Sequence, residues 1–347
     1  MFKPLLIFTV CVFAIFSCSD KVEVPDVSAI NVSFDVIRTE QMIFGTADQS
    51  ELVQSLSLLQ QNHTSFFDVY FNHIFPVGPA NNLDSLAMAI LEFKSQPLAD
   101  TMLTKVNAKY RDVAFLEKAF KKAFQYCQYY FPDRTVPDLY TIVSEFGYQG
   151  FIFEGNGGKD ALGIGLEMFL EGELQYKRIE PDNPGFSDYI TKTWNQDYIV
   201  KKILDVLLSD IVEITNGNKM MDHMISNGKK IYILSHLLPE VHDSILFEYP
   251  LDQTEWCKDN ELEMWSFFIE KNLLQESNPN LINKYINPSP DSPGMPKQAP
   301  GRTGNYVGYK IVKDYMNKNA KITLNELALE VDAQKIFELS KYKPRRI

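Results

Sequence analysis

Apolar and polar positions first alternate and then recur at helical spacing along the N-terminal third of the chain. Val32, Phe34 and Val36 alternate with polar neighbours, which predicts a half-buried strand. From there to Pro132, apolar residues recur three and four positions apart, which predicts a layer of helices. The segments that carry this period are ELVQSLSLLQQNH, SFFDVYFNHIF, NLDSLAMAILEFKSQ and AFLEKAFKKAFQYCQYYF.

The period changes between residues 137 and 170. Three short apolar runs, PDLYTIVSEF, GFIFEG and ALGIGLEMFL, are separated by glycine-rich turns such as GNGGKD, which predicts strands of one sheet. Helical spacing then returns in DYIVKKILDVLLSDIVEI, MMDHMISNGKKIYILSHLL, DNELEMWSFFIEKNLL, NYVGYKIVKDYMNKN and LNELALEVDAQKIFELSK.

One segment interrupts these later helices. Residues 287 to 304 hold five prolines and three glycines, so we expect an irregular loop there. No internal repeat, heptad array or interdomain linker is visible. The pattern therefore predicts a single α+β domain, mostly helical with a small sheet, over residues 31–347, ending in a C-terminal helix.

A different pattern precedes this body. Lys3 is followed by an apolar run from Leu5 to Phe16, which has the length of a signal-peptide core and is too short to span a bilayer. The run ends in Ile15-Phe16-Ser17-Cys18, which resembles a lipobox, with a bulky Phe16 where a small residue is commoner. We predict that residues 1–17 are a signal peptide and that Cys18 carries lipid, with residues 18–30 as anchor and tether. An ordinary signal peptide or a core helix is the alternative.

Net charge limits the partners. The 347 residues carry a formal charge of −11, and removal of the predicted signal peptide leaves 33 basic against 45 acidic residues, or −12. Such a surface repels phosphate backbones, which argues against nucleic acid as a partner. Cys127 and Cys257 would be the remaining thiols. An oxidising compartment would permit them to pair, but their spacing does not decide it.

Histidine spacing gives no sign of a metal site. The chain has five histidines: His63, His73, His223, His236 and His242. No pair has the H-E-x-x-H spacing that places two imidazoles on one helical face. His236 and His242 come closest, but Pro239 ends the helix between them. Surface and helix-end roles are favoured, and we expect no metal and no cofactor other than the lipid.

Other catalytic motifs are also missing. No G-x-S-x-G elbow is present, and GNGGKD at residues 155–160 lacks the spacing of a phosphate loop, so it is interpreted as a turn. Asp205, Asp210 and Glu213 fall on the polar side of an amphipathic helix, where a solvated face explains them better than acid-base chemistry. No catalytic residue is predicted, and the protein is not expected to be an enzyme.

Four residues are candidate anchors for a protein partner. Trp256 and Trp265 lie in an acidic helical segment, and Arg302 and Tyr306 lie beside the proline-rich loop. Aromatic and arginine side chains carry much of the binding free energy of protein interfaces. Packing in the core is the alternative for each of them.

Several strings, taken in order, indicate a family. VEVPDVSAINVSFDVIR, FFDVYFNHIFPVG, YFPDRTVPDLYTIVSEF and LGIGLEMFLEGE are followed by ISNGKKIYILSHLLP, EWCKDNELEMWSFFIEKNLL, APGRTGNYVGYKIVKDYM and DAQKIFELSKYKP. The chain resembles the gliding-motility-associated lipoproteins of the GldB type from the anchor to its end. The resemblance implies a lipoprotein of the cell envelope, held in the inner or outer membrane, that gliding requires. It also implies other envelope proteins of the gliding machinery as partners and a noncatalytic, scaffold-like role.

A more distant likeness supplies the competing hypothesis. The order of strands, a long helix, ISNGKKIYILSHLLP and PGRTGNYVGYKIV is similar to that of zincin-type peptidases, whose metal helix would fall near residues 196 to 214. The helix there reads NQDYIVKKILDVLLSDIVE and contains no histidine, so it cannot hold a zinc-activated water. The likeness implies a zincin-like fold without its catalytic residues. An envelope hydrolase with an unrecognised site is the alternative.

Overall fold

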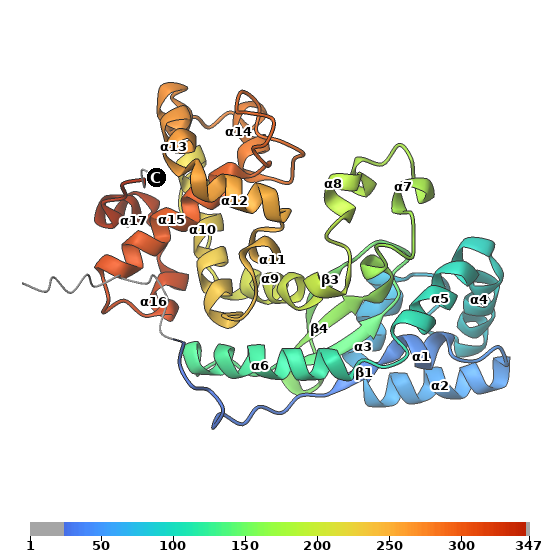
Figure 1. Ribbon diagram of the computed structural model, residues 1–347. Coiled ribbons are helices and arrows are strands. Elements are labelled where there is room, and N and C mark those ends of the chain that lie inside the picture. The colour runs from blue at the N-terminus through green and yellow to red at the C-terminus, as the bar shows by residue number, and fades with distance from the viewer. Residues whose placement is uncertain (1–23, 345–347) are drawn as a thin grey trace, which may run out of the picture.

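The computed structural model describes residues 24–344, in which helices surround a small four-stranded sheet (Figure 1). Helices α1 to α5 lie at one end of the sheet and helices α10 to α17 at the other. This arrangement confirms the prediction of a mostly helical α+β fold. Cys18 and the predicted signal peptide lie outside the described residues.

The sheet has the order β1-β2-β4-β3. Its strands are β1 (Val36–Arg38), β2 (Asp138–Ile142), β3 (Gly150–Glu154) and β4 (Asp160–Gly165). Strands β1, β2 and β4 are parallel, and β3 pairs with β4 in the antiparallel direction across the GNGGKD turn. Strand β1 is shorter than the predicted strand. Of the alternating residues Val32, Phe34 and Val36, only Val36 lies in it. The third run leaves the sheet at Gly165 and continues as a 3-10 turn over Leu166–Phe169.

The helices before the sheet follow the predicted period. They are α1 (Thr39–Phe44), α2 (Gln49–Asn62), α3 (Thr64–Val69) with a π-helical turn over Tyr70–Ile74, α4 (Leu83–Ser95), α5 (Pro97–Lys109) and α6 (Ala114–Tyr130). The sequence analysis missed α5. Its signals are Pro97 at the first helical position and the buried Ala99, Met102, Leu103 and Val106 at helical spacing.

The helices after the sheet are α7 (Tyr176–Ile179), α8 (Asp188–Thr191), α9 (Ile199–Ile211), α10 (Met220–Leu237), α11 (Asp243–Phe247), α12 (Leu251–Asp259), α13 (Glu261–Glu270), α14 (Pro279–Ile286), α15 (Thr303–Lys318), α16 (Leu324–Leu329) and α17 (Ala333–Ser340). The segment LNELALEVDAQKIFELSK, predicted as one helix, is two. Thr323 caps α16, and Asp332 starts α17 by accepting a hydrogen bond from the Lys335 amide.

Helices α10 and α15 make the closest helix pair of the C-terminal half. A Cβ atom added to Gly228 of α10 would lie 2.4 Å from the backbone carbon of Gly308 in α15. The buried Lys229 donates hydrogen bonds to the carbonyls of Glu213 and Ala328, which joins the segment after α9 and the end of α16 to α10. These contacts position α9, whose other side lies against β3 and β4.

The predicted loop between α14 and α15 is confirmed over residues 287–302, and α15 then includes Thr303 and Gly304. Part of the loop is buried: Ser292 donates a hydrogen bond to the Pro300 carbonyl and contacts the Thr303 hydroxyl at 2.8 Å. Cys127 and Cys257 are both buried and free, so they do not form a disulfide in this structure. Burial raises the pKa of Cys127 to about 11.

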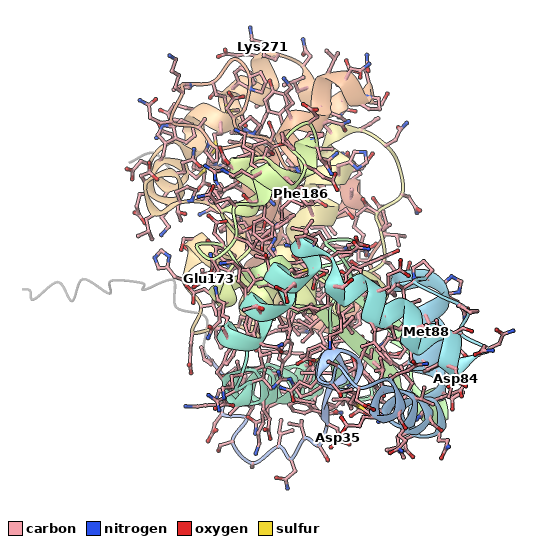
Figure 2. The ribbon with its side chains drawn as sticks, turned by 90° about the vertical axis from the view of Figure 1, so that its right-hand side faces the viewer. Asp35, Asp84, Met88, Glu173, Phe186 and Lys271 are labelled. Carbon is pink, nitrogen blue, oxygen red and sulfur yellow. The ribbon has the colours of Figure 1, made fainter. Side chains whose placement is uncertain are left out.

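Figure 2 shows Lys271, at the end of α13, and Asp35, before β1, at opposite ends of the molecule. Between them, Phe186 is buried, whereas Met88 on α4 is 60% exposed. Within residues 24–344, the helices are too short or too polar to cross a bilayer.

Candidate functional site

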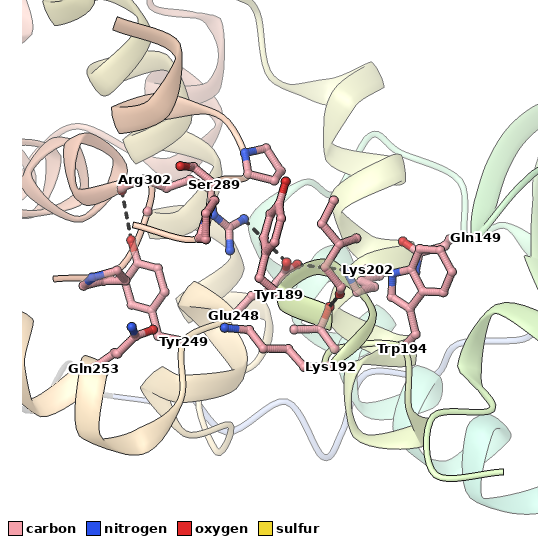
Figure 3. A pocket seen from close by; sticks show the side chains of 16 residues that line it. Gln149, Tyr189, Lys192, Trp194, Lys202, Glu248, Tyr249, Gln253, Ser289 and Arg302 are labelled. Carbon is pink, nitrogen blue, oxygen red and sulfur yellow. Dashed lines mark hydrogen bonds and ion pairs between the residues drawn. The ribbon is translucent and has the colours of Figure 1, made fainter. Parts of the chain in front are cut away.

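A cavity of about 170 Å³ lies between five segments of the chain, of which the one before β3 contributes Gln149 (Figure 3). The chain after α8 contributes Lys192 and Trp194, and the start of α9 contributes Lys202. The link between α11 and α12 contributes Glu248, and the proline-rich loop contributes Arg302. Figure 3 shows Trp194 and Gln149 at one end of this cavity, Tyr249 and Gln253 at the other, and the charged side chains between them. We call this cavity the cationic cleft.

Glu248 is the shared partner of three cations. Its Oε1 atom lies 2.7 Å from Nζ of Lys201 and 3.2 Å from Nζ of Lys202, and its Oε2 atom lies 3.5 Å from Nη1 of Arg302. Burial raises the pKa of Glu248, but the three positive charges outweigh burial and hold this pKa well below its usual value. Glu248 is therefore ionised and holds the cations together.

Two residues of this cluster have a backbone conformation that favours glycine. Glu248 has φ 57° and Arg302 has φ 60°. Such left-handed residues cost roughly 1–2 kcal/mol each and persist only when surrounding contacts hold them. Here Arg302 Nη2 donates to the Phe247 carbonyl at 3.1 Å, and Tyr249 Oη donates to the Arg302 carbonyl at 2.9 Å. The guanidinium is thereby fixed in position over the Tyr249 ring.

Helix α9 supplies the deepest charges. Lys201 pairs with Asp205 one turn later at 2.5 Å as well as with Glu248. Burial lowers the pKa of Lys201, and the two carboxylates more than compensate and raise it. Asp205 is therefore a partner of a buried lysine and not only part of a solvated face. Asp210 pairs with the exposed Arg134 at 2.9 Å, as a surface acid would.

Lys192 differs from the other cations of the cleft. Its side chain is exposed, and Figure 3 shows it extending across the cleft toward Tyr249 and Gln253. The partial burial of its amine against the cleft wall and the nearby charge of Arg302 lower its pKa, although the carboxylates of Glu248 and Asp252 act in the opposite direction. The cleft lining thus carries Lys192, Lys202 and Arg302 against Glu248, a formal charge of +2 in a chain whose total is −11.

A second cavity of about 180 Å³ continues from the cationic cleft and shares Tyr249, Pro288 and Arg302 with it. Lys201, Lys230 and Asp205 line its far side, together with Asn227 and Asn305. The amide of Asn227 donates to the side-chain oxygen of Asn305 at 2.9 Å. Arg302 is therefore the common wall of the two cavities.

The structure brings only one of the four candidate anchors to the cleft, which is Arg302. Trp265 is half-buried against Phe337 and Tyr342, with ring centroids 5.9 and 5.2 Å away. Trp256 is half-buried on α12, and Tyr306 is 4% exposed and packs on Phe247. Burial gives Tyr306 a role in the core instead of on a contact surface.

The sequence analysis did not find Lys192, Lys202, Glu248 or Tyr249. None of these four residues belongs to a motif in the sequence. These residues come together only through the packing of α8, α9 and α11 with the proline-rich loop. The left-handed conformation of Glu248 also has no sequence signal of the kind that glycine or asparagine would give.

Three of the five histidines have structural partners. His236 is buried with Nδ1 2.8 Å from the Tyr232 carbonyl, and burial lowers its pKa. His63 Nδ1 lies 3.0 Å from Tyr140 Oη, and His242 Nδ1 accepts a hydrogen bond from the Ser244 amide at the start of α11. Among residues 24–344, histidine, cysteine, aspartate and glutamate side chains form no group of three or more that could hold a metal ion.

A buried acid outside the cleft has a structural role. Glu167 Oε1 accepts hydrogen bonds from the Ser144 amide and hydroxyl at 2.7 and 2.6 Å and from the Phe146 amide at 3.2 Å. These bonds hold a turn in which Glu145 and Phe146 both have positive φ. Burial raises the pKa of Glu167. The carboxyl thus stabilises the end of β2.

Comparison with known protein families identifies a match over most of the chain. The family model described as gliding motility protein GldB matches residues 20–344. No curated protein and no solved structure matches the chain. The matched segment includes every residue of the cationic cleft, and it begins two positions after Cys18. The chain therefore belongs to the family of the gliding motility protein GldB.

Proposed function

We propose that the protein is a lipid-anchored, noncatalytic component of the gliding machinery in the cell envelope, and that it works by binding through the cationic cleft. Membership of the GldB family supplies the process. The charge pattern of the cleft carries the binding part of the proposal, because two lysines of α9 and Arg302 of the proline-rich loop converge on one buried carboxylate, and Lys192 faces the same cavity. Such preorganised charge suits recognition of a charged partner.

The relation to zincin-type peptidases belongs to the same proposal. Helix α9 lies against β3 and β4, at the position in the chain where the metal helix of a zincin would be expected. The helix contains no histidine, so it lacks the imidazoles needed to hold zinc, and it carries the charged residues Lys201, Lys202 and Asp205. A zincin-like body that has exchanged a metal site for an ionic cluster is consistent with this pattern. Such a body would act by contact.

The anchor part of the proposal rests on the N-terminal pattern together with the family, whose members are described as lipoproteins. Acyl chains on Cys18 would add about 0.8 kcal/mol of membrane affinity per buried methylene. Residues 19–30 would then connect the body to either the inner or the outer membrane. The partners would be other envelope proteins of the gliding apparatus.

The test uses cells that lack the chromosomal copy and express variants at matched protein levels. We expect the deletion to stop gliding and Cys18→Ala to lose labelling by a lipid precursor, because the modified thiol is gone. Single His223→Ala, His236→Ala and His242→Ala variants should glide, since a contact role needs none of their imidazoles. Normal lipid labelling of Cys18→Ala would end the anchor proposal. If cells with a stable histidine variant are as immobile as the deletion strain, a metal or catalytic role becomes the preferred hypothesis.

A further inference from the structure

The cationic cleft has more positive charge than its own residues neutralise. Glu248 is already shared by Lys201, Lys202 and Arg302, while Lys192 faces the same cavity with no hydrogen-bonded or ion-paired acceptor in the described part of the chain. Three cations and one carboxylate leave the lining at +2. We propose that the cleft binds a compact dianionic group of the phosphate monoester type, held between Lys192 and Arg302.

Unused donors line this cavity. A guanidinium has five N–H donors, and Arg302 uses Nη1 for Glu248 and Nη2 for the Phe247 carbonyl, so further donors remain. Lys202 Nζ has three hydrogens and donates one to Glu248. The amide nitrogen of Gln149, also in the lining, is buried without a hydrogen-bond partner. A ligand with several acceptor oxygens would satisfy these groups.

The size of the cavity and its charge select the class of ligand. A volume of about 170 Å³ admits a phosphate with a small carrier and excludes a polymer. A phosphate monoester carries about −1.5 to −2 charges near pH 7, which matches the excess of the lining, whereas one carboxylate would neutralise half of it. The acidic surface elsewhere repels polyanions, so the anion must be small or terminal.

The residues around the cleft hold its charged groups in place before a ligand binds. Buried Trp194 and Tyr249 form aromatic walls, and apolar walls of this kind strengthen charge interactions inside the cleft. The Arg302 guanidinium is held by the Phe247 carbonyl and by the Tyr249 ring, so little side-chain freedom remains to be lost on binding. Lys192, in contrast, is free to close over the bound group.

The experiment is calorimetric titration of the purified full chain in a nonionic detergent, at about pH 7.5, where phosphate is mainly a dianion. Inorganic phosphate, glucose 6-phosphate, acetate and glucose are the ligands. We expect millimolar or tighter binding of the two phosphates, at least about tenfold weaker binding of acetate, and no binding of glucose. Tighter binding of glucose 6-phosphate than of inorganic phosphate would show that the cleft recognises the group on a carrier.

Matched variants locate the bound group. Lys192→Gln should weaken phosphate binding about tenfold, because one charge-assisted contact is lost, and Lys192→Arg should restore most of it. Lys271→Gln removes an exposed lysine at the end of α13, outside the cleft lining, and should change nothing. The inference is wrong if phosphate does not bind, if acetate binds as tightly as phosphate, or if Lys192→Gln binds phosphate like the wild type. This inference rests on the proposed function. Because the titration uses purified protein and no cells, a failure to bind phosphate would leave the role in gliding to be decided by the cellular test described above.

Discussion

At the residue scale, the decisive feature is a buried carboxylate with more cationic partners than it can neutralise. Glu248 is 12% exposed and contacts three positive side chains. Removing one partner of a buried ionic cluster is costly because the remaining charges stay buried without compensation. Glu248 thus organises the cleft and also contributes to the stability of the fold.

This role predicts a pH-dependent loss of stability in Glu248→Gln. At neutral pH we expect its free energy of unfolding to fall by about 3 kcal/mol, because the cations lose their counter-charge. The folded pKa of Glu248 lies well below its usual value, so its contribution is complete above the unfolded pKa of about 4.3 and is lost as pH falls toward the folded pKa. The difference in the free energy of unfolding between the variant and the wild type should therefore become smaller below about pH 4.3.

Urea unfolding at a series of pH values from 7 downward measures this difference in the free energy of unfolding. Glu240→Gln is the matched control, because Glu240 is exposed between α10 and α11, and it should unfold like the wild type throughout. A Glu248→Gln chain as stable as the wild type at pH 7 would show that the cluster does not depend on this carboxylate.

At the element scale, two helices that approach at glycine hold the C-terminal half together. Gly228 of α10 faces the backbone of Gly308 in α15, and a Cβ on Gly308 would lie 1.8 Å from the Met224 carbonyl oxygen. These positions bring α15 close to α10, and Arg302 immediately precedes α15. The approach of the two helices therefore sets where the guanidinium enters the cleft.

Gly228→Ala should lower the free energy of unfolding by about 2 kcal/mol. Alanine would improve helix propensity by about 1 kcal/mol, but overpacking against a backbone that cannot move aside costs more. Thermal or urea unfolding measures the sign of this change in the free energy of unfolding directly. Asn317→Ala, on the exposed side of α15, is the control and should be neutral or slightly stabilising. Stabilisation by Gly228→Ala would mean that α10 and α15 are not in close contact there.

Most elements could be predicted from the sequence because their apolar period is long and regular, as in α6 and α10. The prediction failed where tertiary packing or a local cap decides. Helix α5 was missed, and Asp332 divides the last predicted helix into α16 and α17. Of the site, only Arg302 was found. Lys192 and Glu248 lie 56 positions apart (248 − 192) without a motif, so only the folded chain brings them together.

At the scale of the whole molecule, an acidic body contains a positively charged cleft. A net charge of −11 keeps polyanionic surfaces away, while the lining of the cleft at +2 attracts a small anion. In the proposed function, the lipid at Cys18 would hold this cleft near a membrane, where a partner of the gliding machinery would present the anionic group. On this proposal, the protein would serve gliding by binding at Lys192 and Arg302.

The most direct test of this account is the gliding of cells whose only copy of the protein is Lys192→Gln. Lys192 is exposed and has no hydrogen-bonded partner among the described residues, so the variant should fold and accumulate normally. We expect gliding to be slowed severely or abolished, to return in Lys192→Arg, which keeps the charge, and to be normal in Lys271→Gln. If Lys192→Gln cells, at the same protein level, glide as fast as the wild type, the cationic cleft is not how this protein serves gliding.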